Sequence, residues 1–313
     1  SALKNAGGFD ARRRLFSGIS AMIDSRYKHI FLFPALLVLV AIIIFPLIYT
    51  VRLSFSGWDI NRPGLDSVGW KNYARALVDG GFWNSMGTLY QMVFFCVLFE
   101  YTLGFSLALL LWKQVKAGRF FRLLFIIPMC VTPVVMAVVW KTIFHETLGP
   151  LNDILSWFGI AAVPWLSEAT PAFIAIILVD IWQWTSFMFI LLLAGLMSLP
   201  KEPYEAAQID GAGPIRTFVH VTFPLMAPIT IAALVIRVIE SSKLMETIYA
   251  MTSAGPGSAT ETTSYLLYIR SLREFQIGYT ASLSVIYLVI MIIALTLFAK
   301  LLSRALIGRS EAR

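Results

Sequence analysis

Six long apolar stretches constrain this chain more than any other feature. Each is long enough to cross a bilayer as a helix, which takes about 20 residues, and irregular backbone is not tolerated against lipid. We therefore expect an all-α membrane protein with six transmembrane helices. The first stretch is too long for the apolar part of a cleaved signal and lacks an Ala-x-Ala exit, so we count it as a span. The stretches cover residues 30–51, 86–112, 120–144, 170–199, 224–249 and 278–302.

Composition supports a membrane protein and argues against other classes. The chain has 313 residues, of which 58% are hydrophobic and 14% charged, whereas soluble domains carry roughly a quarter charged residues. The net charge of +7 does not indicate nucleic acid, because the basic residues flank the apolar stretches instead of forming a stripe. Cys96 and Cys130 lie inside apolar stretches and imply no disulfide framework. His29, His145 and His220 show no metal-ligand spacing.

The distribution of Lys and Arg predicts the sidedness. Both terminal tails, the 113–122 segment and the loop after residue 199 carry basic residues, whereas residues 145–169 carry none. The loop between the first two stretches is also basic, but it is longer and its weight is lower. We therefore expect both termini and the loop at 200–224 to lie in the cytoplasm.

The loop at 200–224 is unusually polar for so apolar a chain. Pro203 and Pro214 stand where helices can begin, and Gly211 interrupts the helix-forming stretch between them. This predicts two short helices at an angle, with Glu205 and Asp210 available to a partner. A solvated connecting loop with ordinary caps is the alternative, although long loops without a role are uncommon.

Polar side chains inside two predicted spans are candidates for a substrate pathway, because ionisable residues in a membrane are costly and usually functional. One set, at spacings i, i+3 and i+4, shares a face of the fourth span, and another covers one side of the fifth. Hydrogen-bonding groups beside an indole ring suit a sugar. The two sets are Asp180, Gln183 and Trp184, and Arg237, Glu240, Ser241, Lys243 and Leu244.

Structural interpretations of the same residues remain open. Arg237 and Glu240 stand at i, i+3 and would then pair with each other, while Asp180 would hydrogen-bond a neighbouring helix. Glu100, in the second span, fits a structural or interfacial role better than a substrate site. Arg237 with Lys243 would also suit a phosphate, sulfonate or carboxylate on the substrate.

A specific motif runs through the polar loop. It reads Glu205-Ala206-Ala207, then Gly211 after three residues, then Val221, Phe223 and Pro224. With this motif the chain resembles the permease subunits of binding-protein-dependent ABC importers, in the carbohydrate-uptake branch of the maltose and glycerol-phosphate type. The likeness extends to residues 68–73, 149–165, 255–262 and 278–284. It departs at Ser253-Ala254, where the family often has two glycines, and the large outer domain of the maltose permease is absent.

The resemblance implies a type I ABC importer permease fold and a division of the chain. Residues 1–29 and 303–313 are then cytoplasmic tails, 30–51 the first span, and 86–302 the permease core with a coupling loop at 200–224. The family's loop docks on a cytoplasmic ATPase subunit, so the implied coupling residues are Glu205, Ala206, Ala207, Asp210, Gly211, Ala212 and Pro224.

The expected function is therefore import of a sugar, glycoside, polyol or sugar derivative across a bacterial inner membrane. No Gly-x-x-x-x-Gly-Lys-Ser/Thr loop occurs, so we expect no enzyme activity and no bound cofactor in this chain. ATP and Mg would be used by two partner ATPase subunits, beside a second, different permease and a solute-binding protein. The alternative is a stand-alone secondary transporter, which would usually show internal repeats with matching broken helices. A membrane enzyme is remote, because no catalytic motif is found.

Overall fold

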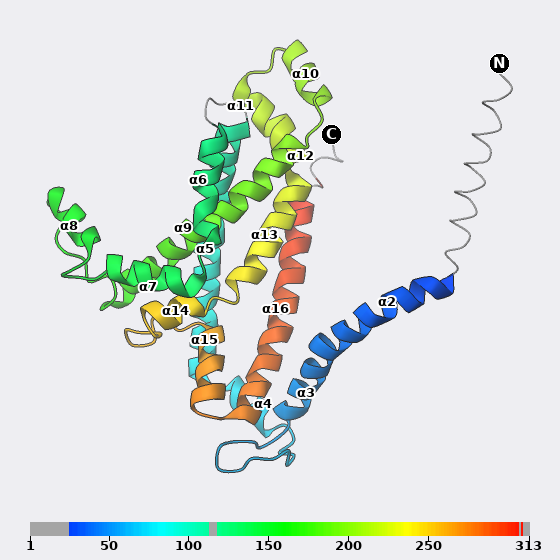
Figure 1. Cartoon of the computed structure of the whole chain (residues 1–313), viewed down its shortest axis with the longest axis vertical. Coiled ribbons are helices and arrows are strands. Elements are labelled where there is room, and N and C mark those ends of the chain that lie inside the picture. Colours follow the sequence, from blue (N-terminus) through cyan, green and yellow to red (C-terminus); the bar gives the residue numbers. More distant parts are fainter. Residues whose placement is uncertain (1–24, 113–117, 307, 309–313) are drawn as a thin grey trace.

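The computed structural model describes residues 25–112, 118–306 and 308. Residues 1–24, 113–117, 307 and 309–313, on which part of the predicted sidedness rests, lie outside this range. The described part is helical, with two isolated β-bridges between Ser56 and Ser67 and between Asp59 and Arg62. Figure 1 shows α5, α13 and α16 running along the long axis of the molecule, with α9 crossing them.

The helices, in chain order, are α2 (Ser25–Leu39), α3 (Phe45–Ser54), α4 (Lys71–Leu77), α5 (Gly80–Trp112), α6 (Gly118–Cys130), α7 (Pro133–Ile143), α8 (Pro150–Trp157), α9 (Ala169–Met197), α10 (Glu202–Ile209), α11 (Pro214–Thr217), α12 (Phe223–Leu225), α13 (Ala227–Ser241), α14 (Glu246–Met251), α15 (Thr263–Tyr268) and α16 (Ile277–Leu306). Short π-helical turns follow α2, α11 and α15, over Val40–Ile44, Phe218–Thr222 and Ile269–Arg273.

Four to six membrane spans fit these helices. Leu32–Ser54, Gly80–Trp112, Ala169–Met197 and Ile277–Leu306 are each long and apolar enough, and two bent pairs qualify if each pair counts as one span. The bend is 96° between α6 and α7 and 64° between Pro214–Leu225 and α13. The third and fifth stretches are therefore not straight, because prolines remove backbone donors and break the helical ladder where each pair bends.

The fifth predicted span also ends earlier than its sequence suggested. We expected one helix as far as Tyr249, but α13 stops at Ser241 and a turn separates it from α14. The turn is held by side chains from elsewhere: the hydroxyls of Tyr287 and Ser264 both donate to the carbonyl of Ser242, at 2.7 and 3.0 Å. The polar end of the stretch is thus a cross-linked turn and not a continuation of the helix.

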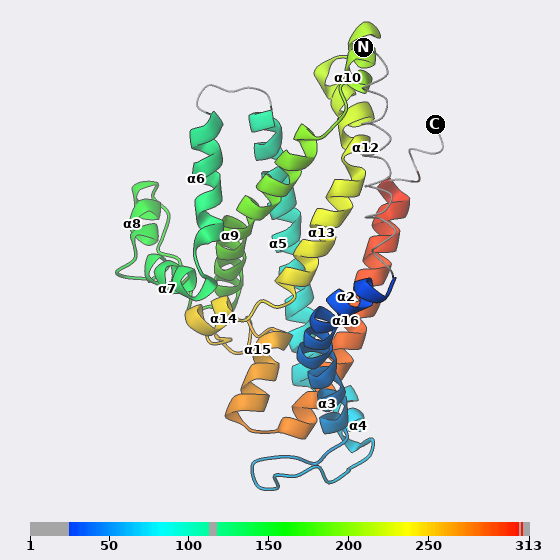
Figure 2. The same cartoon turned by 45° about the vertical axis from the view of Figure 1, so that its right-hand side comes forward.

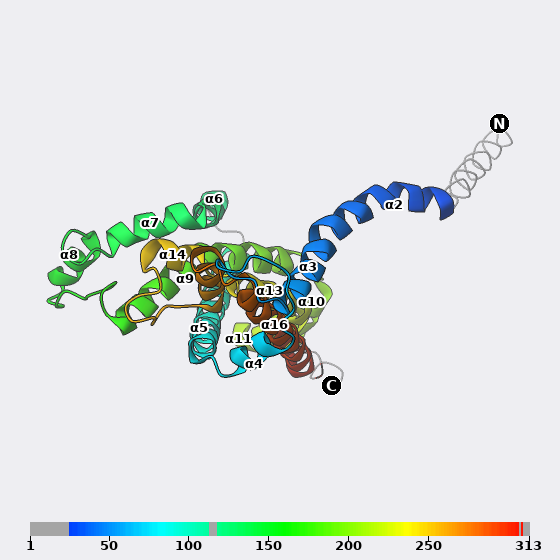
Figure 3. The ribbon, with the colours of Figure 1, turned by 90° about the horizontal axis from the view of Figure 1, so that it is seen from below.

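The first span extends away from the rest of the molecule. Its α3 half packs against α16, whereas α2 points outward in both the side view and the view from below (Figures 1 and 3). None of the apolar window in Leu32–Ser54 is buried within the chain. This apolar surface must be covered by lipid or protein.

The core of the bundle is the contact between α5 and α9. Fully buried Leu89, Met188 and Phe189 belong to its main apolar cluster. Gly104 of α5 allows the closest approach, because a Cβ there would lie 2.6 Å from the Met188 Cβ and 2.9 Å from the Phe189 backbone nitrogen. The two helices carry the polar residues of the fourth and second spans, so this contact fixes how those residues face each other.

A cluster of ionic and aromatic contacts holds helices together at the end of the bundle that lies opposite α10. Asp79, just before α5, accepts hydrogen bonds from Arg270 and from the Tyr279 hydroxyl (2.5 Å), and its other oxygen accepts from the Phe82 N–H at 3.1 Å. Arg75 of α4 stacks on the Tyr279 ring at 3.9 Å. Burial opposes ionisation of Asp79, but the hydrogen bonds outweigh it and hold the pKa of this carboxyl well below its usual range.

Candidate functional site

The polar loop folds as two short helices joined by a sharp corner. α10 contains Pro203 in its first turn and α11 begins at Pro214, so the prediction of two proline-initiated helices is confirmed. At the corner, the Gly211 N–H donates to the Gln208 carbonyl (3.1 Å) and the Ala212 N–H to the Ala207 carbonyl (2.9 Å). This is the Schellman arrangement, in which the residue after the C-cap takes a positive φ. Gly211 has φ +69°, a conformation that favours glycine.

Most of the predicted coupling residues lie on the surface of this loop. Glu205, Ala206, Asp210 and Gly211 are exposed, while Ala207, Ala212 and Pro224 are half-buried.

Two apolar side chains that sequence reasoning missed are also exposed there. Ile209 is 88% exposed and Ile215 79%, one on each short helix. The signal that could have found them is a large aliphatic residue in an otherwise polar loop. Together with the acids they form a mixed surface of the kind that proteins use for contacts.

Aromatic contacts anchor the loop to the ends of the long helices. The rings of Trp112 and Tyr204 lie 5.4 Å apart, and the Tyr204 hydroxyl donates to Thr222 at 3.2 Å. A hollow of about 800 Å³ lies between the loop and the ends of α5 and α9 and is lined in part by Glu205 and Gln208. The contacts of Tyr204 therefore hold the loop in position, while the corner at Gly211 is exposed and available to another protein.

The second polar cluster lies inside the bundle and consists of three charges from three helices. Arg237 of α13 donates through Nε to Glu100 Oε2 (2.5 Å) and through Nη2 to Glu100 Oε1 (2.8 Å) and to Asp180 Oδ2. The exposed fractions are 1%, 0% and 2% for Arg237, Glu100 and Asp180. We refer to these three residues as the charge triad. Buried charges in such a setting persist when they are paired and hydrogen-bonded.

The other two predicted residues of α9 also contact protein groups. The Trp184 ring stacks on the Arg237 guanidinium, 4.6 Å from its centre. Gln183, 3% exposed, donates from Nε2 to the Val131 carbonyl at 2.7 Å. Val131 stands at the bend between α6 and α7, where regular helical hydrogen bonding is interrupted. Gln183 thus satisfies a carbonyl that the bend leaves without a helical partner.

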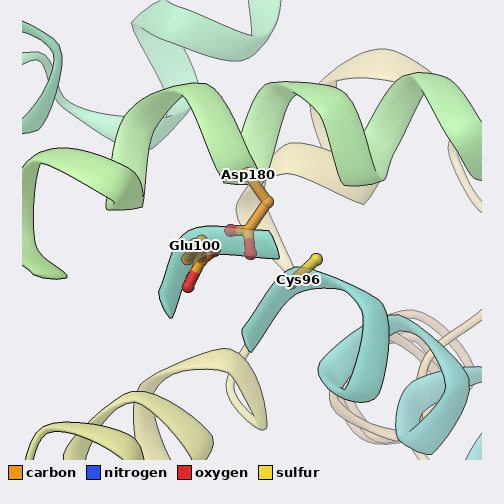
Figure 4. A group of neighbouring side chains, drawn as sticks. All are labelled: Cys96, Glu100 and Asp180. Atoms are coloured by element: carbon orange, nitrogen blue, oxygen red, sulfur yellow. The ribbon is translucent and has the colours of Figure 1, made fainter. Parts of the chain in front are cut away.

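Cys96 brings a thiol to the same place. Its sulfur and the carboxylates of Glu100 and Asp180 lie within 4.8 Å of one another (Figure 4). Figure 4 shows Asp180 reaching down from α9 towards the two residues of α5. Such donors suit a metal ion, but the guanidinium of Arg237 already bonds to both carboxylates. The cluster is therefore an ion-pair site in its present arrangement.

The remaining residues of the α13 set divide between interior and surface. Ser241 is 2% exposed, and its hydroxyl has no partner among the described residues. Leu244 belongs to an apolar cluster with Cys96 and Ile248. Lys243 pairs instead with Glu240 at 2.7 Å, with side chains 63% and 37% exposed. Lys243 and Glu240 thus lie away from the buried triad.

These contacts decide between the structural interpretations of the charged residues. Pairing of Arg237 with Glu240 is wrong, because Glu240 pairs with Lys243 and Arg237 faces α5 and α9. The expectation that Asp180 bonds a neighbouring helix is confirmed by its contact with Arg237 of α13. Glu100 is buried in the same triad, which agrees with a structural role.

The fold and the exposed loop define a membrane permease component. Residues 100–310 match the family described as the binding-protein-dependent transport system inner membrane component. The chain belongs to this family, which confirms the resemblance and favours an importer subunit over a stand-alone secondary transporter.

Relatives and solved structures agree. The chain is 35% identical to a trehalose/maltose transport system permease protein MalF of Thermococcus litoralis, over 85% of this chain and 91% of that protein. It is 32% identical to a sulfoquinovosyl glycerol transport system permease protein SmoG of Agrobacterium fabrum, over 81% and 82%. A chain of a bacterial ABC transporter that imports the acidic polysaccharide alginate superposes with a TM-score of 0.78 at 21% identity, covering 93% and 99%. That similarity concerns the fold alone.

Proposed function

We propose that this chain is the permease subunit of an ATP-driven importer for a sugar, glycoside, polyol or sugar derivative. A solute-binding protein delivers the substrate from outside, and alternating access moves it inward. The observation that carries the proposal is the anchored loop with an exposed Schellman corner at Gly211. Such a corner can transmit motion from a partner because its base is tied to the long helices. The named sugar-transport relatives support the substrate class.

The proposed arrangement has six spans, with each bent pair counted as one. Residues 30–51 form the first span, 86–302 the permease core with the coupling loop at 200–224, and 1–29 and 303–313 cytoplasmic tails. The last turn of α16, the facing ends of α5 and α6, and α10 lie at one end of the bundle (Figures 1 and 2). This common end supports a cytoplasmic C-terminus and loop; the basic N-terminal tail favours the same side for that terminus.

The partners follow from the missing phosphate loop and the family. Two ATPase subunits use ATP and Mg, a second and different permease completes the pathway, and this chain binds no cofactor itself. The assembly lies in a bacterial inner membrane. The contact with the ATPase is formed or supported by Glu205, Ala206, Ala207, Asp210, Gly211, Ala212 and Pro224. Ile209 and Ile215 add apolar surface to this contact.

For the substrate pathway we propose the faces of α9 and α13 that meet at the charge triad. Trp184 offers a ring face, and Ser241 offers a hydroxyl that has no partner in the part of the chain that the structure describes; both suit a sugar. The packing and hydrogen bonds that support this region come from Asp180, Gln183, Arg237 and Leu244. Glu240 and Lys243 stand at its edge as an exposed pair.

The coupling proposal is tested by co-expressing the chain with its ATPase and second permease and purifying the complex. We expect the ATPase to co-purify with the wild type and to be lost when Glu205→Arg and Ile209→Asp are combined, because charge and apolar contact are both reversed. Asp153→Asn on the distant α8 serves as the control. Undiminished recovery of the ATPase with the double variant would refute the role of the loop.

A further inference from the structure

Around the charge triad, the basic side chains of the described residues are already paired with carboxylates. Near the end of α13, exposed Lys243 pairs with Glu240, and Glu246 begins α14. Arg237 is balanced by Glu100 and Asp180, and Lys243 by Glu240. The triad itself has one positive and two negative charges, a net charge of −1 when all three are ionised.

The Arg237 guanidinium is occupied both by hydrogen bonds and by stacking. Its Nε and Nη2 donate to carboxylates, and one face of the guanidinium is stacked on Trp184. Only 1% of the residue is exposed. A carboxylate, phosphate or sulfonate on a substrate would have to displace a buried carboxylate and leave it unpaired, which is costly in a low dielectric. Arginine at this position therefore does not act as an anion receptor.

Protonation of the triad does not change this result. If one of the two carboxylates held a proton, the region would be neutral, and Arg237 would still keep the other carboxylate. In neither state does the centre of the bundle carry a net positive charge. An anion faces repulsion in the first state and no attraction in the second.

The groups that do remain available are uncharged. The Ser241 hydroxyl is buried and has no partner among the described residues, and it lies one helical turn after Arg237 on α13. The Trp184 ring is half-buried, and one face is taken by Arg237. A hydroxyl and an indole can bind a neutral polyhydroxyl compound by a hydrogen bond and by stacking.

We propose that this permease selects a neutral sugar or polyol and discriminates against anionic derivatives, and that the charge triad is the reason. This inference deepens the proposed import function and rests on it. Family likeness leaves the question open, since the matched proteins include a trehalose/maltose permease and an importer of an acidic polysaccharide.

The test uses the complete complex with its binding protein in proteoliposomes that contain ATP. They receive an equimolar mixture of trehalose, maltose, sorbitol, glucuronate, maltobionate and glycerol 3-phosphate, and the lumen is analysed by mass spectrometry. We expect the neutral probes to exceed the anionic ones by about tenfold or more, as one unit charge at close range implies. Import of an anionic probe at an equal or higher rate overturns the inference and leaves the import function intact. Absence of ATP-dependent import of every probe counts against the sugar-import function itself.

A variant separates the triad from other sources of selectivity. Asp180→Asn removes one negative charge while Arg237 keeps Glu100, so we expect the ratio of anionic to neutral import to rise about tenfold. Asp153→Asn removes the same charge from exposed α8 and should leave the ratio unchanged. An unchanged ratio in an assembled Asp180→Asn complex contradicts the assignment to the triad. If that variant fails to assemble, the selectivity of the wild type decides the proposal.

Discussion

Asp79 illustrates how much a single side chain contributes at the end of the bundle opposite α10. It joins the chain segment before α5 to Arg270 and to Tyr279 of α16, and it also accepts from the Phe82 backbone. Three separate parts of the sequence therefore depend on one carboxylate. Because these partners bind its ionised form, the contribution of Asp79 to stability depends on pH.

The sign of that dependence is fixed by the direction of the pKa shift. The pKa of Asp79 is lowered from 3.8 in the folded protein, so its stabilisation is complete above that value and decreases as pH falls further. We expect the melting temperature of the purified protein to decline below about pH 4 more steeply in the wild type than in Asp79→Asn. Exposed Asp66→Asn is the control. Parallel curves for the wild type and Asp79→Asn would show that another group is responsible.

Gly211 sets the backbone geometry of the loop corner. Its φ is +69° and nothing lies within 4 Å of a Cβ built there, so substitution strains the backbone without a clash inside the chain. Gly211→Ala should cost about 1 kcal/mol and reduce uptake. Gly213→Ala, at φ −69° and equally open, should do neither.

A bulky residue at the same corner tests the contact with the ATPase. Gly211→Trp places a large ring on the exposed side of the loop, so we expect ATP-driven uptake to be abolished while the complex still assembles. Uptake in proteoliposomes and gel filtration of the complex measure the two effects. Normal uptake with Gly211→Trp would show that the corner is not a joint.

At the scale of elements, the contact of α5 with α9 depends on Gly104. A Cβ there would lie 2.6 Å from that of Met188, so Gly104→Val forces the helices apart and should cost about 1–3 kcal/mol. Gly87→Val lies on the same helix with open space around it and should be nearly neutral. Thermal unfolding in detergent compares the two. Equal melting temperatures would mean that the interface adapts.

The bend between α6 and α7 depends on a contact from α9. Gln183→Leu removes the hydrogen bond to the Val131 carbonyl and leaves this half-buried acceptor unpaired, at a cost of about 1 kcal/mol. Hydrogen exchange at residues 131–136 should speed up. Exposed Gln91→Leu on α5 should have no such effect. A substrate-binding role alone, in contrast, would lower uptake without changing exchange at the bend.

At the scale of the whole molecule, sidedness is open to direct measurement. In a Cys130→Ser background, which removes the exposed native thiol, we introduce Asp210→Cys or Asp153→Cys. An impermeant maleimide should label Asp210→Cys only in inside-out vesicles and Asp153→Cys only in right-side-out ones. Labelling of both positions from one side contradicts the proposed topology.

The sequence predicted the spans better than it predicted their shape. Hydrophobicity belongs to a segment, so the apolar stretches were located without knowing their neighbours. The bend after Val131 depends on prolines together with a partner on α9, and proline alone does not indicate where a span turns. The loop was predicted in detail because caps and turns are encoded locally, as Pro203, Gly211 and Pro214 show.

The charge triad was beyond such reasoning. Arg237 stands 137 residues from Glu100 and 57 from Asp180, and its correct partners depend on the rotation and depth of three helices. Local spacing favoured Glu240, which is close in sequence but turned towards Lys243. The periodicity of a sequence indicates which residues share a face of a helix, but it does not indicate which other helix packs against that face.

The corner at Gly211 has a consequence for how such a subunit diverges. Its angle is set by two backbone hydrogen bonds and one positive φ, and side chains contribute little to it. In the proposed coupling, the surface residues of the loop can therefore be exchanged to suit a different ATPase while the corner keeps its angle. Recognition of the partner and transmission of its motion are separable in this proposal, so we expect a chimeric loop that retains Gly211 to couple to a different ATPase.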